Sequence, residues 1–236
     1  VYLATGEHGT LAAIKRVHAH LADVAEFRKR FRREVIASRR VTSDHTARVI
    51  DADTDVAVPW LASEFVWGPS LRDALAEVNR LGEAAVVRLA AGLAAALRDI
   101  HAAHLIHRDL SPSNVLLADD GPRVIDFGIV RAAEGATRRG IMNTAVTRSG
   151  MVIGAPGYMS PEQAEGRELT SASDVFSLGT TLLVAATGAN PFEGSGIPQT
   201  MYNVVHVDPD LDALPARLRA LIEPCLAKDP LQRPTP

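Results

Sequence analysis

The residues His107-Arg108-Asp109-Leu110-Ser111-Pro112-Ser113-Asn114 carry the strongest structural signal in this 236-residue chain. They place the carboxylate of Asp109 five residues before the amide of Asn114. Twelve residues after Asn114 comes Asp126-Phe127-Gly128, a second carboxylate that follows an apolar, strand-like run. A proton acceptor and two oxygen ligands for a hard cation are the groups needed to hold a magnesium-bound nucleotide beside a hydroxyl. These residue types are therefore the ones that a site for phosphoryl transfer would need.

Composition and charge exclude several other classes of protein. The chain is 47% hydrophobic and 22% charged, which is ordinary for a soluble globular protein. Its net charge of −3 argues against a nucleic-acid partner, because no basic excess is available to displace counterions from phosphates. The basic runs 28–30 and 32–33 fall in a helical pattern, and we interpret them as a solvated helix face.

Cysteine content and hydropathy give expectations about compartment. The single cysteine, Cys225, excludes an internal disulfide and two-cysteine zinc motifs, and it is expected to be a buried structural thiol. No run approaches the roughly 20 apolar residues needed to cross a bilayer. A signal peptide is absent from the sequence as well. These features predict a cytoplasmic location and no membrane contact within this chain, with an anchor outside it left open.

The sequence pattern changes character near residue 66. Residues 1–66 read as strands around one helix, and residues 67–236 read mainly as helices. The fold class expected is α+β, with a small β-rich lobe and a larger helical lobe that meet near residues 66–71. Strands are predicted over 1–4, 11–17, 49–50 and 60–66, and the helix between them has Phe27, Phe31, Val35 and Ser38 on one face.

The second region contains a buried helix and a hairpin. Apolar residues that recur every three or four positions predict the helix, and they are Val86, Leu89, Leu93, Leu97 and Ile100. A hairpin is expected between runs 115–118 and 123–126, with its turn at Asp120-Gly121. Residues 105–107, just before the Asp109 motif, also read as a short strand.

Lys15 and Glu34 are predicted to form an ion pair. Lys15 ends the apolar run 11–14, and Glu34 falls on the same helical stripe as Phe27 and Phe31. A carboxylate on the apolar face of a helix is costly unless a cation pairs with it. We therefore expect Lys15 to pair with Glu34, which would aim the ammonium group at phosphate oxygens.

These motifs together resemble the bacterial eukaryotic-like serine/threonine protein kinases. The run Gly157-Tyr158-Met159-Ser160-Pro161-Glu162-Gln163-Ala164 is especially similar to that branch, and the resemblance covers nearly the whole chain. It implies a two-lobed protein kinase domain, an N-lobe at 1–66 and a C-lobe at 67–236. The implied activity is transfer of the γ-phosphoryl group of ATP to protein Ser/Thr hydroxyls, with Mg²⁺ as cofactor. Autophosphorylation, and with it self-association, is a further expectation.

The resemblance also assigns roles to individual residues. The catalytic set would be Asp109 as base with Lys15, Glu34 and Arg108, and Mg²⁺ would be held by Asn114 and Asp126. ATP would be bound by these two and Lys15, by the backbone of Glu64 and Val66, and by the apolar walls Val1, Ala13 and Leu116. Structural roles fall to His107, Phe127, Gly128, Glu162, Asp174 and Arg233, with Arg233 pairing with Glu162 and Asp174 holding the backbone of the catalytic loop.

Residues between Asp126 and Glu162 are expected to form an activation segment. Thr147 and Ser149 resemble the paired phosphoacceptors of bacterial kinases. A phosphate on either residue would bind Arg108 through charge-assisted hydrogen bonds and order the segment. The other interpretation of these residues is a flexible polar loop.

The chain departs from the family pattern in three places. The Gly-rich loop over the phosphates is missing, which we interpret as trimming of a longer protein. Ser111 stands where Ser/Thr kinases usually have a lysine, and Ala155 stands where they usually have a threonine. Since both residues concern one network around the transferring phosphate, a pseudokinase that acts as a nucleotide-responsive binding module is the alternative function. A small-molecule phosphotransferase is disfavoured by the Ser160-Pro161-Glu162 platform with Arg233, and tyrosine specificity stays open.

Overall fold

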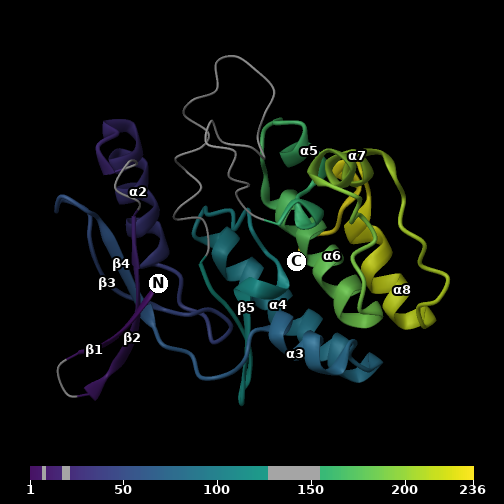
Figure 1. The fold of residues 1–236 in the computed structure, drawn as a ribbon, viewed down its shortest axis with the longest axis horizontal. Helices are drawn as coiled ribbons and strands as arrows, with labels where there is room; N and C mark the ends of the chain where they lie inside the picture. Colours follow the sequence, from purple (N-terminus) through teal and green to yellow (C-terminus); the bar gives the residue numbers. More distant parts are fainter. Residues whose placement is uncertain (7–8, 18–21, 127–154) are drawn as a thin grey trace.

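The computed structural model describes residues 1–6, 9–17, 22–126 and 155–236, and it has a small β-sheet lobe beside a larger helical lobe (Figure 1). The small lobe contains a four-stranded antiparallel sheet in the order β1-β2-β4-β3. Lys15 lies on the inner strand β2 and pairs with Leu61 of β4, while the ladder with β1 ends one residue earlier at Ile14. The strands are β1 (Tyr2–Thr5), β2 (Leu11–Arg16), β3 (Val49–Asp53) and β4 (Trp60–Glu64).

Helix α2 (Ala25–Ser38) packs against the sheet of the small lobe. The predicted apolar stripe is its buried face, on which Phe27 and Phe31 stack with ring centroids 5.9 Å apart. This stripe packs with Val49 and Leu61 into a core separate from that of the large lobe. Glu34 lies on α2 next to the stripe, so its carboxylate is carried into the space between the lobes.

The large lobe is built around the helix pair α4 (Glu83–Ala102) and α6 (Ser171–Thr187). The predicted stripe of α4 is buried, and it belongs to the same core as Phe176 and Leu182 of α6. The remaining helices are α3 (Leu71–Val78), α5 (Pro161–Ala164), α7 (Ile197–His206) and α8 (Ala216–Ile222). Short 3-10 turns are η2 (Pro112–Asn114), η4 (Pro156–Tyr158), η5 (Glu223–Leu226) and η6 (Pro230–Gln232).

A hairpin of β5 (Val115–Ala118) and β6 (Gly121–Val124) joins the two lobes. Its turn lies at residues 119–120, one residue before the predicted turn, and β6 ends two residues earlier than predicted. The peptide N–H of Val124 donates to the His45 carbonyl at 2.8 Å, so a segment of the small lobe runs along β6. The carboxyl end of β6 therefore leads to Asp126, which contacts Lys15 of the sheet.

The predicted strand at 105–107 is wrong. These residues form a loop, because side chains rather than a neighbouring strand satisfy their backbone near His107. The connection between the lobes is fixed by Gly68, whose φ is +143°. A Cβ at this position would lie 2.1 Å from the Leu117 carbonyl oxygen, so only glycine permits this close approach to β5.

None of the helices in the described part of the chain has the length and apolar character that crossing a bilayer requires.

Candidate active site

Asp174 holds the backbone of the loop that carries Asp109. This carboxylate is fully buried on α6, and it accepts hydrogen bonds from the backbone N–H groups of His107 and Arg108, both at 2.8 Å. The ring Nε2 of His101 donates to it as well, at 2.8 Å. Arg108 has a φ of +67°, a left-handed conformation that a non-glycine residue adopts only under constraint. The bonds to Asp174 supply that constraint.

His107 is a neutral structural histidine inside this loop. Burial lowers the pKa of its ring, against the nearby carboxylates of Asp174 and Asp109. Its Nδ1 accepts a hydrogen bond from the Asp109 N–H at 3.2 Å. The proton therefore sits on Nε2, which donates to the Ile125 carbonyl at 3.1 Å. One imidazole thus links the Asp109 loop to the segment that ends in Asp126.

Asn114 is oriented with its amide oxygen available. Its Nδ2 donates to the Asp109 carbonyl at 2.8 Å, which fixes the direction of the side chain. The backbone carbonyl of Asn114 accepts a hydrogen bond from the Ile125 N–H at 3.0 Å, so Asn114 is also connected to the segment that ends in Asp126. The amide nitrogen is engaged, and the Oδ1 atom is the group left to bind a cation.

Lys15 reaches across the lobes to Asp126. Its Nζ lies 3.2 Å from Asp126 Oδ2, and both side chains are about one third exposed. Asp126 has a φ of +60°, so its carboxylate is held in an unusual backbone conformation. The two lobes therefore converge on one point, where a lysine from the sheet meets a carboxylate from the hairpin.

The predicted ion pair between Lys15 and Glu34 is wrong in this structure. Glu34 instead lies 3.4 Å from Nη1 of Arg108. The carboxylate on the apolar helix face does find a cation, as the desolvation argument requires. The partner is Arg108, because Lys15 is engaged by Asp126. The second carboxylate oxygen, Oε2, is buried and has no hydrogen-bond partner among the described residues.

Burial gives Glu34 an unusual titration. Desolvation raises its pKa from 4.5 to about 7, although the charges of Arg108 and Arg30 act in the opposite direction. The folded protein therefore holds this proton at a pH where the unfolded chain has already released it. Near neutral pH, Glu34 changes its charge beside Arg108, which precedes Asp109.

Replacing Glu34 by glutamine should remove part of the pH dependence of stability. Between pH 4.5 and about 7 the unfolded chain binds fewer protons at this site than the folded chain, so wild-type stability falls as pH rises. As pH rises through this window, we expect the free energy of unfolding of the variant to increase by about 1–3 kcal/mol relative to that of the wild type. Urea unfolding at both ends of the window measures it, with the exposed Glu26→Gln as control. If the difference in unfolding free energy between variant and wild type were the same at both pH values, Glu34 would not hold a proton in the folded state as described.

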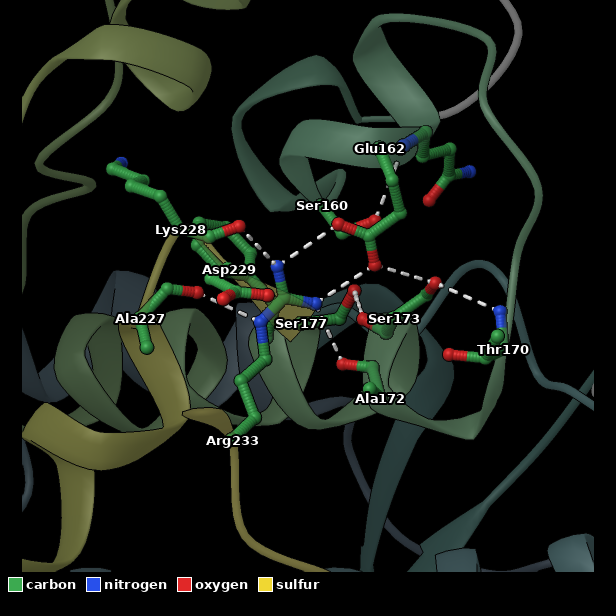
Figure 2. Close-up of polar contacts among 12 residues, drawn as sticks. Ser160, Glu162, Thr170, Ala172, Ser173, Ser177, Ala227, Lys228, Asp229 and Arg233 are labelled. Carbon is green, nitrogen blue, oxygen red and sulfur yellow. Dashed lines mark hydrogen bonds and ion pairs between the residues drawn. The ribbon is translucent and has the colours of Figure 1, made fainter. Parts of the chain in front are cut away.

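Glu162 and Arg233 form a buried ion pair below the site, as expected (Figure 2). Arg233 Nη1 and Nη2 donate to the two oxygens of Glu162 at 2.7 and 2.9 Å. The other guanidinium donors go to three backbone carbonyls, so all five N–H groups are used. These carbonyls belong to Ala172, Ala227 and Lys228. Since Ser173 also donates to Glu162, the start of α5 is fastened to α6 and to the chain end.

Sequence reasoning missed two residues that support the loop carrying Asp109. Gln163 donates from Nε2 to the Arg108 carbonyl at 3.0 Å. His101 donates to Asp174, as described above, and orients the carboxylate that holds the loop. Gln163 lies inside the run 157–164 that carried the family resemblance, but no role was assigned to it. His101 lies on α4 four residues after the buried Leu97, and a polar residue on that buried stripe was the signal that could have identified it.

Among the predicted nucleotide-contacting residues, Ala13, Glu64 and Leu116 lie in the expected strands, whereas Val1 and Val66 lie just outside theirs. Ala13 is paired with Ser63 in the β2–β4 ladder, and Leu116 of β5 is paired with Arg123 of β6. Val1 is 81% exposed at the edge of the small lobe. Glu64 ends β4, and Val66 follows in the connection to the large lobe.

The two departures from the family pattern are both described. Ser111 is buried within the Asp109 loop, and Ala155 is half-buried just before η4. Four of the predicted positions lie outside the described residues, namely Phe127, Gly128, Thr147 and Ser149.

A polar hollow of about 680 Å³ is separate from this site. It lies between the segment 42–48, helix α4 and strand β6. Glu64 is the one predicted nucleotide-binding residue in its lining, and neither Lys15 nor Asp126 contributes to it. The hollow is therefore not the place where the candidate catalytic groups meet.

The donor set fits magnesium. Among the described residues, no group of three or more histidine, cysteine or acidic side chains forms a complete metal cage. Mg²⁺ does not need one, because it is usually bound by one or two carboxylates together with substrate phosphates and water. The Asp126 carboxylate and the free Oδ1 of Asn114 are hard oxygen donors of the required kind.

Comparison with known proteins agrees with the geometry. The family model described as "Protein kinase domain" matches residues 1–236. The chain is 49% identical, over its full length, to serine/threonine-protein kinase AfsK of Streptomyces coelicolor, and 50% identical over 97% of its length to AfsK of Streptomyces griseus. It is 45% identical over its full length to the probable serine/threonine-protein kinase PkwA of Thermomonospora curvata. The chain spans 28–31% of the length of these relatives.

Proposed function

This chain belongs to the protein kinase family, and from that premise we propose that it transfers the γ-phosphoryl group of Mg-ATP to serine and threonine hydroxyls of proteins. The observation that carries the proposal is the contact between Lys15 of the sheet and Asp126 of the hairpin. It brings a phosphate-binding cation and a metal-binding carboxylate to one point between the lobes. We propose residues 1–66 and 67–236 as the two lobes of one kinase domain.

Each residue of the site has a role in this proposal. Lys15 binds phosphate oxygens of the nucleotide, and the backbone of Glu64 and Val66 binds adenine. Asn114 and Asp126 hold Mg²⁺, which neutralises charge on the phosphates when it is bound. Asp109 accepts the proton of the incoming hydroxyl, or orients that hydroxyl, as the phosphoryl group transfers.

Regulation and substrates follow from the same proposal. We propose Thr147 and Ser149 as autophosphorylation sites, with transfer between two copies of the chain. Mass spectrometry of active protein should find phosphate on these residues. If both are unmodified in fully active protein, the proposed regulation is incorrect. Proteins other than the chain itself are proposed as substrates only as a class. The chain spans less than a third of the length of its relatives, and it does not identify an individual substrate.

Phosphoamino-acid analysis tests the acceptor specificity. The chain is incubated with γ-labelled ATP, Mg²⁺ and a mixed protein acceptor such as casein, and the labelled protein is hydrolysed in acid. Labelled phosphoserine and phosphothreonine are expected. Phosphotyrosine alone would contradict the Ser/Thr assignment. Saturable nucleotide binding without any label transfer would favour the pseudokinase alternative.

Restoring the missing cation at position 111 should accelerate transfer. In the double variant Ser111→Lys/Ala155→Thr, a lysine would lie beside the transferring phosphate and a threonine would fix it. A preorganised positive group in such a site lowers the barrier, so we expect a rate increase of about tenfold. Initial rates at saturating ATP measure it. Ser111→Met/Ala155→Thr is the control of similar length without charge, and a tenfold fall in rate would mean that the site is adapted to serine.

A further inference from the structure

Six of the seven basic residues at 28–40, on α2 and just after it, divide into two groups by what they contact, and the seventh, Arg30, acts on the charge of Glu34. Three of them fasten the helix to β3 and to the loop behind it. Arg32 pairs with Asp55, and Arg39 pairs with Asp51 at 2.8 Å. Arg28 donates to the backbone carbonyls of Ala22, Thr54, Val56 and Ala57. The cations of this first group are therefore used inside the small lobe.

The second group, Lys29, Arg33 and Arg40, is not used in this way. Their side chains have no ion pair and no hydrogen bond to any described residue. The spacings of four and seven residues put them on one helix face, because Arg39 keeps a right-handed helical backbone and continues the turn. Ile36 lies between Arg33 and Arg40 on this face, and 51% of it is exposed.

This face points away from the core of the small lobe. The residues that α2 buries are Phe27, Phe31, Val35 and Ser38, on the opposite side of the helix. In Figure 1, α2 lies beside the sheet and apart from helices α3 to α8 of the large lobe. With respect to the described residues, the outer face of α2, defined as Lys29, Arg33, Ile36 and Arg40, is therefore exposed and available to a partner.

Charge identifies the kind of partner. Helix α2 carries five basic and two acidic residues, although the whole chain has 25 basic and 28 acidic ones. A local positive face on a net acidic protein attracts carboxylates, while the overall charge disfavours long-range attraction to nucleic acid. One exposed isoleucine is too little apolar surface to bury in a membrane interface.

We propose that the outer face of α2 binds an acidic segment of a partner protein. Carboxylates of the segment pair with Lys29, Arg33 and Arg40, and an aliphatic side chain of the segment covers Ile36. Opposite charges along one helix face set the register, and the central apolar contact excludes water from it.

A peptide titration tests the proposal without reference to catalysis. The probe is a fluorescein-labelled helical peptide with glutamates and one leucine on the same face, and its analogue has glutamine in place of every glutamate. Fluorescence anisotropy is followed with the unmodified chain, with Lys29→Gln/Arg33→Gln/Arg40→Gln and with Ile36→Ser. The matched control, Arg80→Gln/Arg88→Gln/Arg217→Gln, removes the same charge from exposed positions of the large lobe.

The expected result is saturable binding of the glutamate peptide that weakens as salt is added. The triple variant on α2 should weaken it about tenfold, and the control variant should leave it unchanged. Ile36→Ser should weaken it less than the triple variant. Absence of saturable binding, equal binding of the glutamine analogue, or an equal loss in both triple variants would overturn the proposal. Binding to anionic phospholipid vesicles without binding to the peptide would overturn it too.

Discussion

Replacing Asp126 by asparagine is expected to reduce phosphoryl transfer at least about 100-fold. Asp126 is the one negatively charged ligand in the proposed metal site, because Asn114 supplies a neutral oxygen. Its loss weakens Mg²⁺ binding, and with it the charge neutralisation that the metal gives to the phosphates. The variant also frees Lys15, whose Nζ lies 3.2 Å from the Asp126 carboxylate.

Calorimetric titration of nucleotide with and without Mg²⁺ separates these two effects. Magnesium should strengthen ATP binding to the wild-type chain and have little effect on the Asp126→Asn variant. The control is Asp119→Asn, which removes the same charge at an exposed position in the turn between β5 and β6. Transfer at a wild-type rate by the Asp126 variant would rule out this carboxylate as a metal ligand.

Replacing Glu162 by glutamine should destabilise the large lobe by about 3–5 kcal/mol. The substitution leaves the guanidinium of Arg233 buried without its counter-charge, and burial of an unpaired charge is costly. Both side chains are almost completely buried, at 0% and 2% exposure, so solvent cannot replace the lost contact. Urea unfolding followed by circular dichroism measures the loss.

Acid should have a related effect on the wild-type protein. Burial alone would raise the pKa of Glu162, but hydrogen bonds from Arg233 and Ser173 outweigh it and hold the pKa below 4.5. The stabilisation is therefore present above pH 4.5 and is lost as pH falls through the lower, folded-state pKa. In the Glu162→Gln variant, the free energy of unfolding should therefore fall less steeply as pH decreases below 4.5.

The neighbouring Glu165→Gln is the matched control for stability. Glu165 forms an exposed ion pair with Arg167, and such pairs contribute only about 0–1 kcal/mol. Equal destabilisation by the two variants would mean that burial of the Glu162–Arg233 pair does not govern its contribution.

Much of the fold could be predicted because its elements have strong local periodicity. The stripes of α2 and α4 are buried as the three- and four-residue spacings required. The hairpin boundaries differ from the prediction because Asp120 lies in the turn while Gly121 begins β6. The alternation of apolar and polar residues does not determine where a turn ends and a strand begins. The strand expected at 105–107 failed, because a distant carboxylate on α6 satisfies the backbone there.

The candidate site was predicted in its residues but not in all of its contacts. Sequence position placed Glu34 on an apolar face and so required a cation nearby, yet it could not select between Lys15 and Arg108. That choice depends on the distance between the lobes, which no local pattern encodes. In the structure, Lys15 pairs with Asp126, and Glu34 pairs with Arg108. The long-range pair of Glu162 with Arg233 was predictable only through the family resemblance.

The transfer of labelled γ-phosphate from ATP to casein, compared between the wild-type chain and Asp109→Asn in Mg²⁺ buffer, bears on the whole assignment. A positioned base typically accelerates such a reaction by a factor of about 10²–10⁴. Label incorporation by Asp109→Asn should therefore fall by that factor, while nucleotide binding is retained. Equal incorporation by the two proteins would contradict a kinase mechanism centred on Asp109.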